Sequence, residues 1–427
     1  MRVHPSTPRP LDSTPTAKAS KSAPAAATAP AGTQDRLDRT SSARAPVALV
    51  SPAVAENPDS DPMVHINHLS TLEGRGSPSK GYDTASAYAA ALLEKYGAVG
   101  PNASDPSGNP FFQTFTLRTF ADAPEVDREG PPPVARHGKE LFSGGFYLDD
   151  TLSAADRARI QKRIGGQSVR APAPLTPEAL DAAGVASGTV QNVVGVFPGS
   201  GPNKGQTLLL TAHLDHEGIK RGVVYPGADD NGSGSGTLLS ALPALAELSR
   251  TGQLDCSVAV IFTAAEEKGL VGAKYFVDHP LPGLGVADTF GPINTDMVGR
   301  FEADRMSVIH RSGGKPNYWK DVLEKANQGL GDKAFQVINR DIDSLDGRHD
   351  GGMWSRKGED VLMLYEGLSR RSGGGDMNPD YHQPTDTPDK ILRDNGGEKP
   401  RRFRDILIEL VKTAAGPRPE GTPLVWE

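Results

Sequence analysis

Short apolar runs recur between Gln191 and Tyr365, with segments of helical potential between them. The runs are rich in aliphatic and β-branched residues and read NVVGVF, TLLLTA, SVAVIF, SVIH and VLMLY. Strands that are apolar along their whole length are typical of a mainly parallel sheet buried on both faces. The helical segments include TLLSALPALAEL, which Pro243 should kink or interrupt, and PRRFRDILIELVKTAAG. We therefore predict an α/β fold with a mainly parallel central sheet and helices on both faces.

Changes in composition divide the chain into segments. Residues 1–62 contain no Phe, Tyr or Trp and are rich in Ala, Pro, Ser and Thr, so we expect a disordered N-terminal extension. Residues 63–416 would form one domain, followed by a short tail at 417–427. Inside the domain, the segment 121–188 holds GPPP and PAP and is interpreted as a helical insertion or a lid.

Local patterns predict individual elements on either side of the main sheet region. GYDTASAYAAALLEKYG has apolar residues at helical spacing and ends at Gly97, which suits a helix end. The segment 111–117 alternates large and polar residues and is typical of a strand. Within the insertion, helices are expected at 154–164 and 177–183, where Ser153 and Thr176 are suitable N-cap residues.

The N-terminal extension leaves the location of the protein open. It lacks the apolar core of a secretory signal peptide. A solvated tail is the plain interpretation, and it makes the cytoplasm the default location. The alternatives are an address for an export route that needs no signal peptide, or a removable pro-segment.

Charge and cysteine content exclude several classes of protein. A net charge of −7 and a pI near 5.9 argue against a nucleic-acid partner. Cys256 is the only cysteine, which excludes an intramolecular disulfide, and it is expected to be a small buried residue. The sequence has no run near the 18 or so apolar residues needed to span a bilayer, so no membrane partner is expected.

Five polar segments follow apolar runs or lie in turns rich in Gly, Asp or Pro. Strand ends and the loops beyond them meet at one edge of an open α/β sheet, where such folds build their sites. The segments are LLLTAHLDH, PGADDNGSG, VIFTAAEEKG, INTDMVG and YHQPTDT, and they carry His213, Asp230, Glu267, Asp296 and His382. Two imidazoles and three carboxylates suit zinc, with Co²⁺ or Mn²⁺ as substitutes, and one carboxylate could bridge two cations.

Two further acidic residues have places in this site. Asp215 lies two positions after His213, where a carboxylate can hold the other nitrogen of the imidazole. Glu266 stands beside Glu267, so one of the pair could bind metal while the other handles a proton. Each segment alone is weak evidence for a metal site, because paired Glu residues usually mark a solvated helix start and DDNG is commonly only a turn. Their joint occurrence, in order, favours a two-metal hydrolase.

The motifs HLDH, GADDNGSG, AAEEKGLVGAKYF, NTDMVG and YHQPTDTPDKI resemble the successive signatures of the co-catalytic zinc aminopeptidases of metallopeptidase family twenty-eight. Bacterial leucyl aminopeptidase, aminopeptidase S and aminopeptidase Y belong to this family. LEGRGSPSKGYDTASAYAAALLEKYG resembles its N-terminal segment, so the resemblance covers roughly 63–120 and 189–415. It implies that His213 and Asp296 hold one zinc, that Glu267 and His382 hold the other, and that Asp230 bridges them.

The resemblance also implies a reaction and a substrate. Glu266 would be the general base, Asp215 would support His213, and the substrates would be peptides with a free N-terminus, cut one residue at a time. Apart from the resemblance, we expect a monomer. Two alternatives share the fold. One is a glutaminyl cyclase-like enzyme with a single zinc, and the other is a non-catalytic, receptor-like binding module.

This chain departs from the family at the segment RHDGGMWSRKG. Asp350 falls on the family's Asp, but Gly351 stands where many relatives have His. No tyrosine is found at the upstream position that assists the oxyanion in some members. His349, His310 and Tyr381 are candidate substitutes, each of which is expected to be structural or to line the substrate site. His216 is expected only to pack beside the site.

Overall fold

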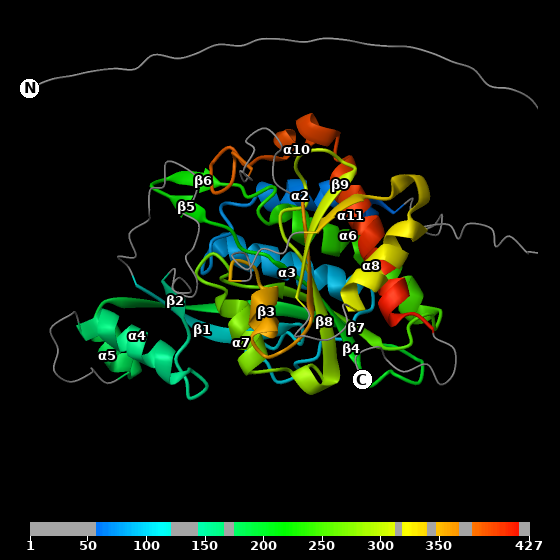
Figure 1. The fold of residues 1–427 in the computed structure, drawn as a ribbon. Helices are drawn as coiled ribbons and strands as arrows, with labels where there is room; N and C mark the ends of the chain where they lie inside the picture. Colours follow the sequence, from blue (N-terminus) through cyan, green and yellow to red (C-terminus); the bar gives the residue numbers. More distant parts are fainter. Residues whose placement is uncertain are drawn as a thin grey trace, which may run out of the picture. The chain divides into compact units, whose positions relative to one another are not determined.

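The computed structural model describes residues 57–120, 144–165, 175–311, 318–339, 347–366 and 378–417, all within one compact unit, Ala48–Glu427. Within these ranges nine strands form one sheet in the order β10-β9-β11-β8-β4-β7-β3-β1-β2 (Figure 1). Their bounds are β1 Phe112–Phe120, β2 Gly145–Phe146, β3 Val185–Phe197, β4 Thr207–His213, β7 Ser257–Thr263, β8 Thr289–Thr295, β9 Arg305–Arg311, β10 Gln336–Asn339 and β11 Val361–Tyr365. A separate hairpin consists of β5, Gly218–Lys220, and β6, Val223–Tyr225.

The sheet is parallel at its centre and antiparallel toward its β1 edge. β4 pairs in parallel with both β7 and β8, and β8 pairs in parallel with β11. In contrast, β3 is antiparallel to β7 and to β1, and β9 is antiparallel to β11. The predicted α/β class is confirmed, in the form of a mixed sheet. The central parallel strands end at the same edge, since His213 lies opposite Thr263 in the ladder.

Alternating side chains of the central strands supply two hydrophobic cores, one on each face of the sheet. In β4, Leu208 and Leu210 belong to the larger core, whereas Leu209 belongs to the smaller one. The helices of the larger core include α3, Lys80–Lys95, α6, Gly232–Arg250, α8, Tyr318–Gly329, and α11, Glu398–Ala415. The smaller core is closed by α7, Val271–Asp278, and α9, Gly351–Ser355. Helices therefore cover both faces, as predicted.

Helix α6 contains Pro243, which was expected to kink or interrupt it. The proline does not interrupt the helix, which runs through 19 residues. Leu238, Leu239, Leu242 and Leu245 on either side of the proline are all buried, so packing offsets the backbone hydrogen bond that proline cannot donate.

The insertion contains the two expected helices. They are α4, Ala154–Gly165, and α5, Pro177–Ala182. The hydroxyl of Ser153 accepts from the amide of Asp156 at 3.1 Å, and that of Thr176 accepts from the amide of Ala179 at 3.2 Å. Residues 121–143 and 166–174 of the insertion lie outside the described residues, and no lid can be assigned from the two helices.

The packed part of the domain begins before the expected boundary at residue 63. A short 3-10 helix, η1, spans Pro58–Ser60 and α2 spans Pro62–Ser70. Asp59 pairs with Lys95 at 2.6 Å, and Asp61 pairs with Arg401 at 2.9 Å. Residues 1–56, for which a disordered extension was predicted, and 418–427 lie outside the described residues. The remaining elements are α10, Pro388–Asn395, and the 3-10 helices η2, Val286–Asp288, and η3, Gly331–Lys333.

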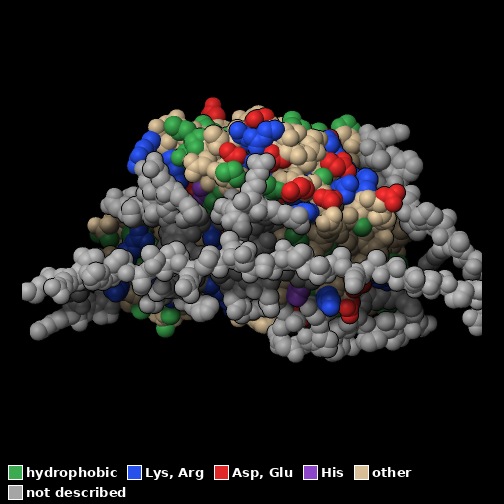
Figure 2. Space-filling view, turned by 45° about the horizontal axis from the view of Figure 1, so that its top comes forward, with side chains coloured by type: hydrophobic (Ala, Val, Ile, Leu, Met, Phe, Trp, Pro, Cys, Tyr) green, Lys and Arg blue, Asp and Glu red, His purple; other side chains and the backbone are tan. Residues whose placement is uncertain are grey.

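The surface agrees with the charge balance of the sequence. On the face shown in Figure 2, the visible Lys and Arg side chains are interspersed with Asp and Glu. Among the described helices, none is both long and apolar enough to cross a membrane.

Candidate metal centre

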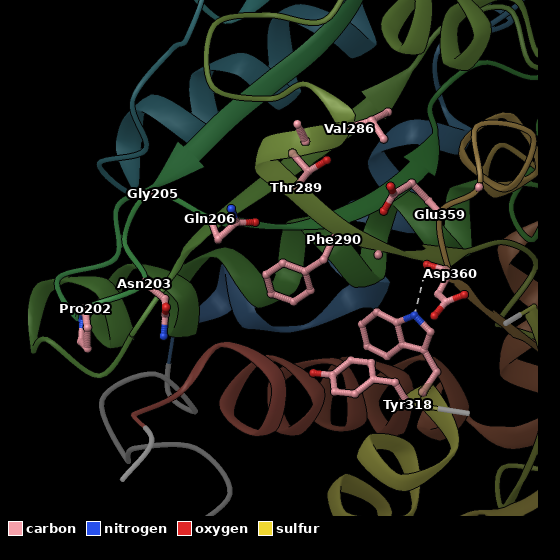
Figure 3. Close-up of a pocket in the computed structure, with 14 residues that line it drawn as sticks. Pro202, Asn203, Gly205, Gln206, Val286, Thr289, Phe290, Tyr318, Glu359 and Asp360 are labelled. Carbon is pink, nitrogen blue, oxygen red and sulfur yellow. Dashed lines mark hydrogen bonds between the residues drawn. The ribbon is translucent and has the colours of Figure 1, made fainter. Parts of the chain in front are cut away.

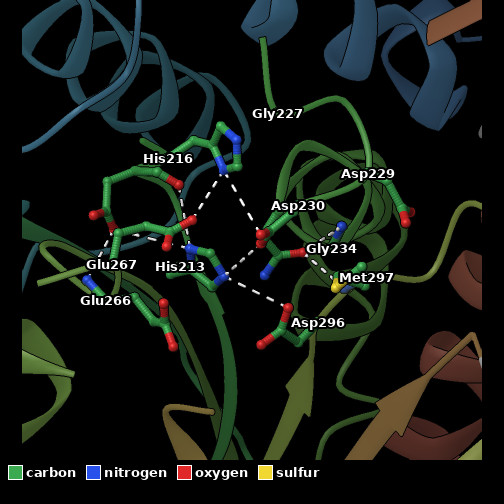
Figure 4. Close-up of polar contacts among 12 residues, drawn as sticks. His213, His216, Gly227, Asp229, Asp230, Gly234, Glu266, Glu267, Asp296 and Met297 are labelled. Atoms are coloured by element: carbon green, nitrogen blue, oxygen red, sulfur yellow. Dashed lines mark hydrogen bonds and ion pairs between the residues drawn. The ribbon is translucent and has the colours of Figure 1, made fainter. Parts of the chain in front are cut away.

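The predicted site residues meet beyond the carboxyl ends of the central strands. His213 is the last residue of β4, Glu267 follows β7, and Asp296 comes directly after β8. Asp230 lies in the loop before α6, and His382 lies before α10. Figure 4 shows His213, Asp230 and Asp296 pointing toward one another. The structure therefore brings together the five residues that the sequence predicts as metal ligands.

The first donor set surrounds the Nε2 atom of His213. This atom lies 3.4 Å from Oδ1 of Asp230 and 3.5 Å from Oδ1 of Asp296. His213 is 1% exposed, and its Nε2 atom has no hydrogen-bond partner among the described residues. A buried polar atom without a partner costs free energy, which a cation at this position would offset.

The second donor set surrounds the Nε2 atom of His382. It lies 3.2 Å from Oδ2 of Asp230 and 3.0 Å from Oε2 of Glu267. Asp230 thus turns one oxygen toward each donor set. This is the arrangement that a carboxylate shared by two cations requires.

The spacing and chemistry of these atoms fit zinc. Tetrahedral nitrogen and oxygen ligands about 2.0–2.1 Å from zinc are separated from one another by about 3.3 Å. The four contacts between donor atoms, from 3.0 to 3.5 Å, bracket that separation. His213, Asp230 and Asp296 would hold one ion, and Asp230, Glu267 and His382 would hold the other.

The protonation states follow from the mutual fields of these groups. Burial alone would lower the pKa of His213, but the carboxylates of Glu266 and Asp296 outweigh it and raise that pKa well above its usual value. Burial likewise opposes ionisation of Glu267, yet His382 and His216 hold the pKa of Glu267 well below its usual range. The site therefore stabilises opposite charges inside the protein, and bound cations would replace the imidazole protons.

Glu266 differs from its neighbour Glu267. Burial raises the pKa of Glu266 well above its usual range, and the carboxylates of Glu267 and Asp296 add to the shift, although His213 lowers it. Cations bound nearby would lower this pKa again. Ala265, directly before it, has a φ of 52°, so the turn that presents Glu266 is in the left-handed region. A partly buried carboxylate beside the donor sets is suited to exchange a proton with a reacting group.

Asp215 does not make the expected contact with the imidazole. Its Oδ1 atom lies 3.9 Å from Nδ1 of His213, beyond hydrogen-bond range, and Nδ1 instead lies 3.2 Å from the carbonyl oxygen of Asp215. The carboxylate accepts a hydrogen bond from the amide of Glu266 at 3.0 Å, which draws it away from the ring. Burial raises the pKa of Asp215 to about 7. Asp215 thus holds the turn after β7 in place.

The structure separates the roles of Asp229 and Asp230. Oδ1 of Asp229 accepts from the amide of Gly299 at 2.9 Å, and Oδ2 accepts from Nδ2 of Asn378 at 2.9 Å. Asp386 accepts from the amides of both residues, at 3.0 to 3.1 Å. Asp229 is therefore engaged in loop hydrogen bonds, whereas the side chain of Asp230 faces the two histidines.

Two residues of the loop after β4 were not predicted to contribute. Nδ1 of His216 lies 2.9 Å from Oε1 of Glu267. Oε1 of Glu217 lies 3.0 Å from Nδ1 of His382. The signal in the sequence was the run HLDHE, which places three further ionisable side chains within four residues of His213.

The candidate substitutes for the missing oxyanion residue lie in different surroundings. The ring of Tyr381 stacks on His382 with centroids 3.8 Å apart. Asp350 accepts from the hydroxyl of Thr263 at 2.6 Å, and burial raises its pKa to about 6. His349 is buried next to it, whereas His310 lies in β9, where it pairs with Leu362 of β11. Tyr381 is thus the candidate in contact with a predicted ligand.

A separate pocket opens at the opposite edge of the sheet. It has a volume of about 470 Å³ and is lined near the starts of β4 and β8 by Gln206, Thr289, Phe290 and Trp319 (Figure 3). The indole nitrogen of Trp319 donates to the carbonyl of Asp360 at 3.2 Å. None of the predicted site residues lines this pocket.

Comparison with known proteins decides the family. The sequence model of peptidase family M28 matches residues 192–406, half of the chain, and this range holds both donor sets. The chain belongs to peptidase family M28. Its resemblance to the co-catalytic zinc aminopeptidases is thereby confirmed.

Individual relatives within and near family M28 agree with this assignment. The aminopeptidase YwaD of Bacillus subtilis is 24% identical over 231 residues, which are 54% of this chain and 47% of YwaD. The chain spans about half the length of several curated relatives that it matches. The solved structure of BSAP, a zinc aminopeptidase from Bacillus subtilis, has a TM-score of 0.55 at 17% identity and covers 85% of this chain and 96% of that one. A glutaminyl cyclase from Tannerella forsythia has a TM-score of 0.50 at 16% identity, covering 83% and 98%. These likenesses confirm the fold.

Proposed function

We propose that this chain is an aminopeptidase that uses two zinc ions to hydrolyse the N-terminal peptide bond of peptides. One observation carries the proposal. The carboxylate of Asp230 has one oxygen 3.4 Å from Nε2 of His213 and the other 3.2 Å from Nε2 of His382. A single-metal site needs no carboxylate shared between two such donor sets.

The residues divide the chemistry between binding and proton transfer. Bound zinc would supply positive charge that lowers the pKa of a water molecule and stabilises negative charge on a carbonyl oxygen. Glu266 would take the proton from the attacking water and deliver it to the nitrogen of the leaving amine. Asp215 would fix the position of Glu266 through the amide hydrogen bond at 3.0 Å.

Membership in family M28 and relatives named aminopeptidases support a peptide substrate with a free N-terminus. We expect no nucleic acid and no membrane among the partners, and a monomer as the active form.

The proposal is tested with a panel of aminoacyl amides and dipeptides, assayed with and without added zinc. Matched N-acetylated substrates serve as controls, because blocking the amine should abolish hydrolysis. We expect zinc-dependent release of the N-terminal residue from free-amine substrates alone. Equal cleavage of the blocked substrates would contradict an aminopeptidase.

A peptide with N-terminal glutamine separates the alternative activity. A glutaminyl cyclase would release ammonia and leave the peptide bond intact, whereas an aminopeptidase would release free glutamine. Absence of turnover with every substrate, together with little or no bound metal, would favour the receptor-like alternative.

A further inference from the structure

His216 is a fully buried imidazole at the second donor set. Its exposure is 0%, and it lies in the loop that leaves β4, three residues after His213. Neither of its ring nitrogens has a hydrogen-bond partner among the described residues. A buried imidazole that only fills space would leave two polar atoms unsatisfied, at a cost in free energy.

The Nδ1 atom of His216 faces the carboxylates. It lies 2.9 Å from Oε1 of Glu267 and 3.7 Å from Oδ2 of Asp230 (Figure 4). These separations are those of ion pairs, but the alignment of a hydrogen bond is reached with neither oxygen. A nitrogen close to two carboxylates but aligned with neither is placed as a ligand to an ion between them would be.

The same two oxygen-bearing groups define the second donor set with His382. The rings of His216 and His382 are 5.8 Å apart between centroids and inclined at 73°. Two imidazoles therefore approach the Asp230 and Glu267 carboxylates from different directions. Their nitrogen-to-oxygen separations, from 2.9 to 3.7 Å, bracket the value of about 3.3 Å expected between ligands of one tetrahedral zinc.

The backbone holds the His216 ring against the site. A Cβ atom at Gly227 would lie 2.4 Å from Cγ of His216, so the ring packs directly on this glycine. The amide of His216 donates to the carbonyl of Arg75 at 3.1 Å. The buried guanidinium of Arg75 donates to the carbonyls of Leu214, at 3.1 Å, and Gly227, at 2.8 Å, and so joins the loops on both sides of the ring.

We propose that His216 is a fourth protein ligand at the second metal position, where it completes a set with Asp230, Glu267 and His382. This inference rests on the proposed two-metal function. It makes the two metal positions differ in their number of protein ligands. Four protein ligands close a tetrahedral site, whereas three leave a position open. The second ion would then be held as a structural ion is, and the position beside His213 and Asp296 would stay open to water and substrate.

A ligand exchange at residue 216 tests the inference. His216→Leu removes the nitrogen at similar volume, and His216→Cys supplies a thiolate close to the position of Nδ1. Metal is counted by elemental analysis after equilibration against a graded chelator, and Co²⁺ absorption spectra are recorded for each protein. The wild type is a built-in control for the spectra, because its one cysteine, Cys256, is buried next to β7.

We expect the wild type to hold two metal equivalents and His216→Leu to lose one of them at chelator levels at least tenfold lower. His216→Cys should regain the second equivalent and show a thiolate-to-cobalt charge-transfer band that the wild type lacks. Unchanged affinity for both ions in His216→Leu, or two bound Co²⁺ ions in His216→Cys without that band, would overturn the proposal.

The design separates this inference from the proposed function. A wild-type protein that holds fewer than two equivalents would contradict the two-metal proposal itself. If His216→Leu does not fold, the spectrum of His216→Cys decides the question. A third variant, His65→Leu, controls for the loss of a buried imidazole, since both ring nitrogens of His65 have partners, at 2.8 Å, away from the site.

Discussion

Oε1 of Glu217 lies 3.0 Å from Nδ1 of His382, the ring nitrogen on the opposite side from the Asp230 and Glu267 contacts. The other oxygen of Glu217 pairs with Lys220 at 2.7 Å. A carboxylate on the remote nitrogen of a metal-binding imidazole fixes the orientation and the tautomer of the ring. Glu217 holds His382 in this way, a role that the sequence had assigned to Asp215 for His213.

Glu217→Gln should therefore weaken the second metal position. The amide keeps the size of the side chain but loses the charge that favours a proton on Nδ1, and loss of such a partner typically lowers metal affinity by about 10- to 100-fold. Chelator competition measures the effect. Glu247→Gln, which alters the exposed pair with Arg250, is the matched control and should leave both affinities unchanged.

Glu266→Gln should retain both metals and the fold while it lowers turnover by about two orders of magnitude or more, the usual contribution of a positioned acid or base. Turnover is measured by release of the N-terminal amino acid, and metal content is determined on the same sample. Near-normal turnover would remove the assigned role. Loss of metal would instead make Glu266 a ligand.

The boundary of the packed domain can be tested by two truncations. Removal of 1–56 should leave the melting temperature unchanged, because the composition of this segment gives it little to bury. Removal of 1–62 also deletes the Asp59 contact with Lys95 and the Asp61 side chain that caps α2, and a lost helix cap alone costs about 1 kcal/mol. Equal melting temperatures for the two truncated proteins would show that η1 adds nothing to stability.

His349 should make the protein sensitive to mild acid. Burial lowers its pKa from 6.5 to about 4, so the folded state keeps the ring neutral while the unfolded state takes up a proton. Stability is then lost as the pH falls below about 6.5, and the loss levels off below about 4. Between pH 7 and 4.5, His349 should lower the free energy of unfolding by about 2 kcal/mol, since each pKa unit corresponds to about 1.4 kcal/mol.

Denaturant unfolding with a chelator present measures this term without a contribution from metal release. Over the same pH interval, the free energy of unfolding of His349→Leu should fall by about 2 kcal/mol less than that of the wild type. Parallel losses in the two proteins would show that another group causes the acid sensitivity.

The sequence predicted the central strands and the site at their ends for a physical reason. TLLLTA and SVAVIF are apolar along their whole length because both faces of the sheet are covered, and a polar residue directly after such a run must lie at the sheet edge. β8 was harder to recognise, because TFGPINT contains glycine and proline. The strands β5 and β6 were not predicted, because each has only three residues and most of these are not buried, so they form no apolar run.

His382 and His216 show where local sequence is insufficient. His382 lies in a loop more than 80 residues after Asp296, and the turn-rich segment YHQPTDT that makes it a candidate does not show which other side chains it meets. His216 faces the carboxylates because Arg75 and Gly227 hold its loop, and the Arg75 contacts join segments more than 130 residues apart in the chain. Such tertiary contacts leave no periodic pattern in the sequence.

The most direct test of the two-metal account is the metal content of wild type, Asp230→Ala and Asp229→Ala after dialysis against limiting chelator. The wild type should hold two zinc equivalents. Asp230→Ala should lose affinity for both, because two cations would then face each other without a shared oxygen. The native Asp229 side chain accepts hydrogen bonds from Gly299 and Asn378 and does not face the histidines. Asp229→Ala should therefore keep both ions more tightly than Asp230→Ala does. One equivalent in the wild type, or loss of both ions in Asp229→Ala while Asp230→Ala retains them, would contradict the account.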